Sequence, residues 1–541
     1  MCQKLEKIGK NPFFFYFALG SLFLMPETLF FALHRHLPLC FLHEKMLVLV
    51  LLVFLVSFVK SYGFVCGFFW MFGAMQTVQF CCLAYFGTSL NPFTISLLFE
   101  ELEDVFSETV HMTGYLWYVP LCVIIPYYAC ARLIKAAPHR FTFAYAWGVV
   151  VCFFIAFAVQ SHIKPDLLMR SYCYAGFNTI TAYTAYFGNI LPKQVMQRGT
   201  AEKEVVFKPY IVSKIAQTPD VNVIVIMGES LNRNHFSLYG YKRDTTPLLK
   251  KRAQQTNFIY KNALSGAVNT LIAVPNFLHV QREPENYKKQ LKSDTYLPKL
   301  AKENGFKTVY IGLQGKAVYT KEALSFFDKS FVYKLSSEKC AEDECIQEAL
   351  SETGFDTPLF LFIQKRNPHA PYEQYYPAKY AVFDKKSDTV NETRVNTYDN
   401  ALLYEDFVID NLLSFFEKNA KRPTYVYYIS DHGEAMGENG QYGHSFLAPA
   451  VTDIPFIFMM FGSQDKVYGQ KIKDMFYPTA YEIGVLIAEK LGYSIENPNI
   501  ADGIFYTNGH NKMGKAGYIV IEKNAAKKTL KRTVVQGNEK E

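Results

Sequence analysis

The sequence predicts an N-terminal bundle of five transmembrane helices followed by a C-terminal α/β domain, whose mainly parallel sheet is covered by helices on both faces. Long apolar blocks dominate the chain up to about residue 160, within a sequence of 541 residues that is half hydrophobic. Beyond about residue 216, short apolar runs alternate with segments of helical periodicity, as in an α/β domain. A chain of this length also exceeds what one hydrophobic core usually organises.

Five apolar blocks are long enough, or nearly so, to cross a bilayer, which takes about 20 helical residues. No small-residue cleavage pattern follows the first block, so a cleaved signal peptide does not explain it. Glu27 lies inside this block, where it either faces the bundle interior or marks the outer end of the span. The transmembrane domain is expected over residues 1–160, with spans near residues 12–33, 45–60, 62–87, 115–134 and 141–160.

Charges on the connections orient the predicted bundle, because short cytoplasmic loops collect Lys and Arg. Basic residues precede the first block and separate the second from the third and the fourth from the fifth. With five spans, the chain beyond residue 160 is expected outside the cytoplasm. The opposite connection, residues 88–114, has no Lys or Arg and carries Glu100, Glu101, Glu103, Asp104 and Glu108.

The remaining composition excludes some function classes. The net charge of +7 is modest and forms no stripe typical of nucleic-acid binding. Residues 161–215 are mixed and aromatic, which suits an interfacial helix and a linker. Cys340 and Cys345 lie close together in the exported half, where a local disulfide is favoured over a zinc site. The basic residues near the C-terminus are interpreted as a solvated tail rather than a lipid-binding patch: Lys527, Lys528, Lys531 and Arg532.

The predicted catalytic domain covers residues 216–541. Helical periodicity is clear from residue 295 and again from residue 398. Chemistry in such domains lies at the carboxyl ends of the strands. Five apolar runs are expected to be buried strands: "VNVIVIM" at 221, "KTVYIGL" at 307, "PLFLFIQ" at 358, "TYVYYIS" at 424 and "IPFIFMM" at 454.

Ligand-type side chains directly follow two of these strands. Glu229 follows the run at 221, whereas Asp431 and His432 follow the run at 424. Carboxylate and imidazole ligands suit zinc, and three protein ligands with an open position are typical of a catalytic site. Each residue alone is weak evidence, but together at the strand ends they predict a metal site.

A third element is "NALSGAVNTLIAVPNF", residues 262–277, in which Thr270 opens an apolar run. A hydroxyl at the start of a helix faces the positive end of the helix dipole, and a nearby metal would favour its alkoxide as a nucleophile. The alternative is an N-cap threonine that satisfies backbone donors. From spacing alone, the N-cap interpretation is favoured.

Several segments closely resemble one family. They are "MGESLNRNHFSLYGYKRDTTP", "NTLIAVPNF", "NPHAPYEQYYP", "YDNALLYEDF" and "SDHGEAMGENGQYGH". The chain resembles the membrane-bound phosphoethanolamine transferases, a branch of the alkaline phosphatase and sulfatase superfamily. The resemblance covers the whole chain, including five spans before the exported domain, and its motifs occur in the same order.

The resemblance implies roles for individual residues. Glu229, Thr270, Asp431 and His432 match the positions that hold the catalytic zinc, with Thr270 as the phosphorylated nucleophile. His369, Glu434 and His444 match positions that line the phosphoethanolamine pocket or a second zinc site, and His369 or His444 would assist by proton transfer or by holding phosphate. The acidic loop resembles the family's donor-headgroup loop, where Glu100, Glu103 or Asp104 would meet the ammonium group; a solvated acidic loop is the alternative.

The implied activity is zinc-dependent transfer of phosphoethanolamine from phosphatidylethanolamine to an envelope acceptor such as lipid A or lipopolysaccharide core. The expected protein is a monomer in the bacterial inner membrane, with its catalytic domain in the periplasm and no nucleic-acid partner. Two alternatives remain: a phosphoglycerol transferase of the lipoteichoic-acid synthase type, and a catalytically silent membrane scaffold. The full ligand set argues against the scaffold.

Three departures from the family pattern concern the site. Gly266 and Asn276 stand where many members have cysteines that bracket the nucleophile. Ala435 replaces the serine expected after Glu434. The segment "IGLQGK", residues 311–316, differs from the Asn-rich segment that helps to bind the headgroup, and Gln314 and Lys316 are weak candidates to replace it.

Overall fold

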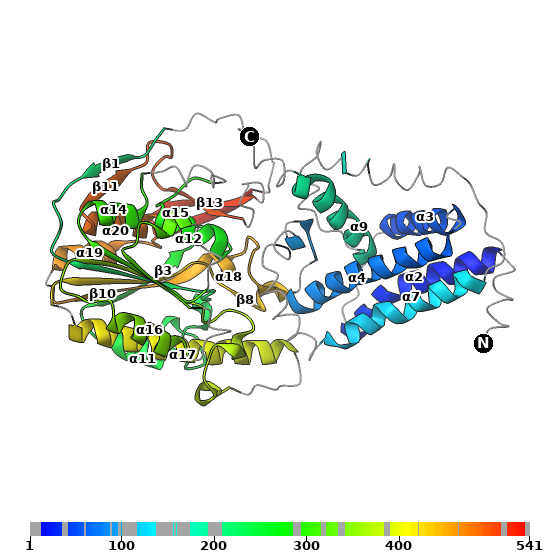
Figure 1. Ribbon diagram of the computed structural model, residues 1–541, viewed down its shortest axis with the longest axis horizontal. Coiled ribbons are helices and arrows are strands. Elements are labelled where there is room, and N and C mark those ends of the chain that lie inside the picture. Colours follow the sequence, from blue (N-terminus) through cyan, green and yellow to red (C-terminus); the bar gives the residue numbers. More distant parts are fainter. Residues whose placement is uncertain are drawn as a thin grey trace. The chain divides into compact units, whose positions relative to one another are not determined.

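The computed structural model (Figure 1) divides into two compact units, residues 1–203 and 204–541, which are described separately. It describes residues 12–34, 42–58, 61–86, 89–92, 94–95, 99, 116–136, 155, 158–159, 174–192, 208–284, 294–314, 321–333, 341–383, 390–419, 421–463, 465–509 and 517–535.

The N-terminal unit contains apolar helices where four of the five spans are predicted. Three of them are long and apolar enough to cross a membrane, within α2, α4 and α7. The second, α3, covers 17 residues and is shorter than a full span of about 20. The fifth predicted span, residues 141–160, lies almost entirely outside the described residues, so five spans stay a prediction. The helices are α2 (Pro12–His34), α3 (Leu42–Phe58), α4 (Tyr62–Phe86) and α7 (Tyr118–Ala136).

Glu27 faces the interior of this unit, which is the first of the two interpretations of this residue. Its side chain is buried, and its Oε1 accepts a hydrogen bond from the backbone N–H of Ala175 at 3.2 Å. Glu44 accepts from the N–H of Tyr174 at 2.9 Å. Both side chains therefore satisfy backbone donors at the start of α9 (Ala175–Ala185). This helix lies within the segment predicted to be interfacial.

The C-terminal unit is built on a seven-stranded sheet with the order β3-β10-β7-β2-β6-β4-β5. The strands from β7 to β5 are parallel, and β10 is antiparallel to both β3 and β7. All five predicted strands belong to this sheet, and the prediction of a mainly parallel sheet is confirmed. The strands are β2 (Asn222–Gly228), β3 (Phe258–Leu264), β4 (Lys307–Gly312), β5 (Lys329–Val332), β6 (Leu359–Gln364), β7 (Thr424–Ser430) and β10 (Asp453–Phe461).

Helices cover both faces of the sheet (Figure 1), so the central strands are buried on both sides. On β2, Val223 and Val225 point to one apolar core and Ile224 and Ile226 to the other. The first core lies under α12 (Thr270–Leu278), α14 (Leu297–Glu303), α19 (Lys466–Asp474) and α20 (Ala480–Lys490). The second lies under α11 (Pro247–Arg252), α16 (Glu342–Ser351) and α17 (Val390–Asn419).

Smaller elements complete the unit. The basic residues near the C-terminus are not a tail: Lys531 and Arg532 lie in β14, and Lys527 and Lys528 lie in the exposed turn before it. Arg532 forms an ion pair with Asp453. Cys345 in α16 is disulfide-bonded. Cys340 lies outside the described residues, so a disulfide between these two cysteines stays a prediction. The minor sheets join β1 (Ile211–Lys214) to β11 (Tyr493–Glu496), β8 (Ala435–Met436) to β9 (Tyr442–Gly443), and β12 (Ile504–Asn508) to β13 (Tyr518–Asn524) and β14 (Thr529–Val535).

Candidate metal centre and active site

The predicted metal ligands meet at the carboxyl edge of the sheet. Strands β2 and β7 are parallel neighbours, and Gly228 lies opposite Ser430 at their ends. Backbone bonds continue the pairing beyond the strands, from the N–H of Asp431 to the carbonyl of Gly228 at 3.1 Å. Glu229 and the Asp431–His432 pair, 202 residues apart, are therefore brought side by side.

The side chains of Glu229, Asp431 and His432 form a compact, fully buried group. One ligand atom from each lies within 4.8 Å of the others. The Nε2 atom of His432 is 3.6 Å from Oε1 of Glu229 and 3.3 Å from Oδ2 of Asp431. These distances leave the three ligand atoms facing a common point.

Thr270 completes the group. It is the first residue of α12, and its Oγ1 lies 3.2 Å from Nε2 of His432 and 3.3 and 3.2 Å from the two carboxylate oxygens of Glu229. The N-cap interpretation of Thr270 is wrong, because the adjacent Asn269 takes that role and accepts from the N–H of Ile272 at 3.2 Å. The Thr270 hydroxyl therefore does not cap the helix, and it lies at the positive end of α12.

The donor set fits a divalent cation. Nδ1 of His432 lies 2.9 Å from the carbonyl of Gly433, which only accepts, so Nδ1 carries the proton and Nε2 presents a lone pair. Oδ1 of Asp431 accepts from two backbone N–H groups, whereas its buried Oδ2 has no hydrogen-bond partner in the described part of the chain. An orphaned carboxylate oxygen, a second carboxylate and a neutral imidazole together match the ligand chemistry of zinc.

Electrostatics also favour a cation here. Burial, followed by the charge of Asp431, raises the pKa of Glu229 to about 7. Burial raises the pKa of Asp431 to about 6 and lowers that of His432 to about 4. The shifts share a cause, because burial disfavours the charged form of all three groups. A bound cation would stabilise the two carboxylates as anions and the imidazole as the neutral form.

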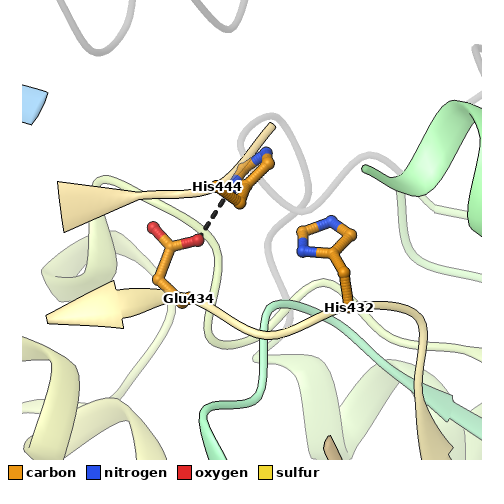
Figure 2. Close-up of side chains that lie close together, drawn as sticks. All are labelled: His432, Glu434 and His444. Atoms are coloured by element: carbon orange, nitrogen blue, oxygen red, sulfur yellow. Dashed lines mark hydrogen bonds and ion pairs between the residues drawn. The ribbon is translucent and has the colours of Figure 1, made fainter. Parts of the chain in front are cut away.

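A second group lies beside the first and consists of His432, Glu434 and His444 (Figure 2). Glu434 points toward His444, and its Oε2 lies 2.7 Å from Nδ1 of that histidine. Tyr372 donates to the other carboxylate oxygen at 2.7 Å. Although burial opposes it, the Glu434 carboxylate raises the pKa of His444 to about 9. The structure therefore presents an imidazolium next to the metal group.

The three predicted active-site histidines lie close to one another. The ring centroids of His432 and His444 are 4.3 Å apart, and those of His369 and His444 are 6.4 Å apart. Because Nδ1 of His432 is bonded to a carbonyl, its one available lone pair faces Glu229 and Asp431. The two groups therefore cannot both use His432 as a metal ligand, and Glu434 with His444 is better suited to holding an anionic substrate.

His369 differs in charge from the neighbouring His444. Its Nδ1 lies 2.5 Å from the carbonyl of Ala370, so Nδ1 carries the proton. Burial, together with the charges of Arg366 and His444, holds the pKa of His369 well below its usual range. His369 is thus a neutral imidazole whose Nε2 carries the lone pair that can accept a proton. The acidic-loop candidates Glu100, Glu103 and Asp104 lie outside the described residues.

Gly266 and Asn276, which stand where many members of the family have cysteines, lie close together. A Cβ added to Gly266 would lie 3.7 Å from Cβ of Asn276. That spacing is typical of a disulfide. The two residues therefore occupy the bracketing positions on either side of Thr270 without a covalent link.

Sequence reasoning missed a buried ionic network under the site. Lys365 follows β6 and is fully buried, with its Nζ 2.6 Å from Glu342 and 3.0 Å from Glu405. Glu342 also accepts from the backbone N–H groups of Arg366 and Asn367, which begin the loop to His369. The signal was present: Glu405 interrupts the apolar stripe of α17, where a lone charge needs a partner.

Replacing Lys365 with methionine is expected to cost about 3–5 kcal/mol of unfolding free energy, because two carboxylates remain buried without their cation. Urea unfolding of the protein in detergent measures the change. The matched control is Lys329→Met, which breaks an exposed ion pair to Glu352 and should cost at most about 1 kcal/mol. Equal effects of the two substitutions would show that the buried network does not hold this region.

The fold and site define a class of protein. The sulfatase family model matches residues 221–485, a range that contains the main sheet from β2 to β10 and the metal group. This match indicates a sulfatase-family domain within the C-terminal unit.

Similar proteins narrow the class. Phosphoethanolamine transferase EptA of Helicobacter pylori is 29% identical over 43% of this chain and 47% of its own length. EptC of Escherichia coli K12 is 24% identical over 67% of each chain. The matched region thus spans about half the length of the EptA relatives.

A solved structure extends the likeness to most of the chain. The integral membrane protein lipooligosaccharide phosphoethanolamine transferase A of Neisseria meningitidis superposes with a TM-score of 0.57 and 18% identity, over 89% of this chain and 95% of that one. At this identity the likeness concerns the fold.

Proposed function

We propose that the protein transfers phosphoethanolamine from phosphatidylethanolamine to a cell-envelope acceptor, namely lipid A or lipopolysaccharide core. One observation carries this proposal: Oγ1 of Thr270 lies within 3.3 Å of both Glu229 and His432. A hydroxyl held against an open set of metal ligands at a helix N-terminus is the arrangement of an activated nucleophile. The names of the EptA and EptC relatives support the same reaction.

Zinc is the proposed cofactor, with Glu229, Thr270, Asp431 and His432 as its ligands. When bound, zinc lowers the pKa of a coordinated hydroxyl and balances charge that develops on phosphorus. The proposal needs one ion, because the lone pair of His432 is available only once.

The chain's own residues then perform two displacements. The oxygen of Thr270 attacks phosphorus of the donor and loses its proton, the bond from phosphorus to diacylglycerol breaks, and diacylglycerol leaves with a proton. The acceptor oxygen next attacks phosphorus, the bond from phosphorus to Thr270 breaks, and the Thr270 oxygen recovers a proton. His444, charged by Glu434, holds phosphate oxygens, and neutral His369 takes the acceptor's proton.

The membrane portion gives this reaction its location. We place the protein as a monomer in the bacterial inner membrane with the sulfatase-family domain in the periplasm. A lipid donor then reaches the site by local encounter at the bilayer surface, because the tether raises its effective concentration.

The test is an in vitro transfer with the full chain in vesicles that contain phosphatidylethanolamine and lipid A. Mass spectrometry should show released diacylglycerol and lipid A heavier by one phosphoethanolamine unit. Transfer of phosphoglycerol from phosphatidylglycerol vesicles would instead support the lipoteichoic-acid synthase type of reaction. Binding of zinc without transfer to any envelope acceptor would contradict the proposed function.

A further inference from the structure

Gln314 occupies a position that the proposed reaction does not use. It follows β4 by two residues, in the segment that departs from the family's headgroup-binding pattern. Its Nε2 donates to Oε2 of Glu229 and, at 2.7 Å, to the backbone carbonyl of Lys365. The side chain thus reaches across the end of β6, from β4 to the metal ligand after β2.

The orientation of this amide is fixed by its two neighbours. A carboxylate oxygen and a backbone carbonyl can only accept, so both must face the NH₂ group of Gln314 rather than its oxygen. Both N–H bonds are therefore used, one on each acceptor. The amide cannot rotate without breaking them.

The backbone carbonyl of Lys365, which is the second acceptor, is held in place by its own residue. The backbone N–H of Lys365 donates to the carbonyl of Met227 at 2.9 Å, which continues the β2–β6 ladder. The side chain of Lys365 is held between Glu342 and Glu405 in the buried network. Gln314 is consequently anchored to the rigid sheet on one side and to Glu229 on the other.

Each carboxylate oxygen of Glu229 then has one fixed donor. Ser230 donates through Oγ to Oε1 at 2.9 Å, and Gln314 donates to Oε2. The remaining lone pairs face Thr270 and His432. Two donors on the outer side of the carboxylate hold its plane in the orientation that presents the inner side to a metal.

We propose that Gln314 is a positioning residue that holds the Glu229 carboxylate in place for metal binding. The inference rests on the proposed function, because it assumes that Glu229 is a metal ligand. It assigns Gln314 a role other than contact with the ethanolamine headgroup. It also explains the residue type: strands lie about 4.8 Å apart, so a side chain that crosses β6 needs the length of glutamine.

The experiment compares zinc affinity of the full chain in detergent, by competition with a chelator, for the native protein and Gln314→Met. Methionine keeps the length and removes both donors. We expect the affinity to fall about 10–100-fold. Gln314→Asn, which keeps the amide but is too short to span β6, should lower the affinity as well. Circular dichroism of the metal-free variants checks that they are folded.

The matched control is Gln470→Met. Gln470 is exposed and donates from Nε2 to Asp474 at 2.7 Å, so the control also removes an amide–carboxylate hydrogen bond. Its zinc affinity should be unchanged. The absorption spectrum of the cobalt(II)-substituted protein gives a second measurement, since a merely structural role for Gln314 would leave the cobalt ligand field unchanged.

The outcomes separate the inference from the proposed function. Weaker zinc binding and an altered cobalt spectrum in Gln314→Met, but not in Gln470→Met, would support the positioning role. Native affinity and spectrum in a folded Gln314→Met variant would overturn that role and leave the proposed function intact. Failure of the native protein to bind zinc would overturn the proposed function and, with it, this inference.

Discussion

Thr270→Ala is expected to reduce phosphoethanolamine transfer by about 10⁴-fold or more, because the substitution removes the oxygen that forms the covalent intermediate. Glu229, Asp431 and His432 remain, so zinc binding should persist at reduced affinity. Thr270→Ser keeps a hydroxyl at the start of α12 and should retain measurable turnover, lowered by the loss of the methyl group that restricts χ1. Mass spectrometry of lipid A after incubation in phosphatidylethanolamine vesicles measures all three proteins.

Thr452→Val provides a matched control for the loss of a buried threonine hydroxyl near the same sheet edge. Thr452 ends α18 (Pro449–Thr452), is fully buried, and its Oγ1 has no hydrogen-bond partner in the part of the chain that the structure describes. Turnover of this variant should stay within about twofold of native, since an unbonded hydroxyl contributes little. Transfer by Thr270→Ala at the control's rate would show that another group is the nucleophile.

The parts of the fold that the sequence predicts share one physical property. Strands β2, β6 and β7 are buried on both faces, so each is a continuous apolar run that needs no knowledge of its neighbours. The β12–β14 sheet was not predicted, because its strands are half exposed and β14 carries Lys531 and Arg532. Basic residues in β14 are typical of a solvated segment, and the sequence alone does not show that Asp453 lies beside Arg532.

The candidate site divides in the same way. Glu229, Asp431 and His432 could be predicted because each directly follows a recognisable strand. The capping residue could not, since Asn269 and Thr270 are adjacent and a shift of one residue decides which of them caps α12. The role of Gln314 depends on β6 lying between β4 and β2, which is a property of strand order that local sequence does not contain.

Asp431→Asn is expected to abolish zinc binding and to lower transfer by about 10³-fold or more, because an amide does not replace a carboxylate ligand of zinc. The effect on stability should change sign with the metal. In the chelated protein, removing one of two adjacent buried carboxylates should stabilise the fold by about 1–3 kcal/mol. In excess zinc, the native protein gains binding free energy that the variant lacks, so the variant becomes the less stable of the two.

Thermal unfolding in detergent, with chelator and then with zinc, measures this reversal. Asp294→Asn, at an exposed carboxylate paired with Lys299, is the matched control and should respond to zinc as the native protein does. The stability of the chelated variant also depends on backbone contacts of this side chain. Oδ1 of Asp431 accepts backbone N–H bonds from Ser230 and His432. An asparagine retains that acceptor, so loss of stability in the chelated variant would mean that the negative charge itself holds the β2 and β7 loops together. A stability crossover between the two conditions would instead identify Asp431 as a residue retained for the metal at the expense of the apo fold.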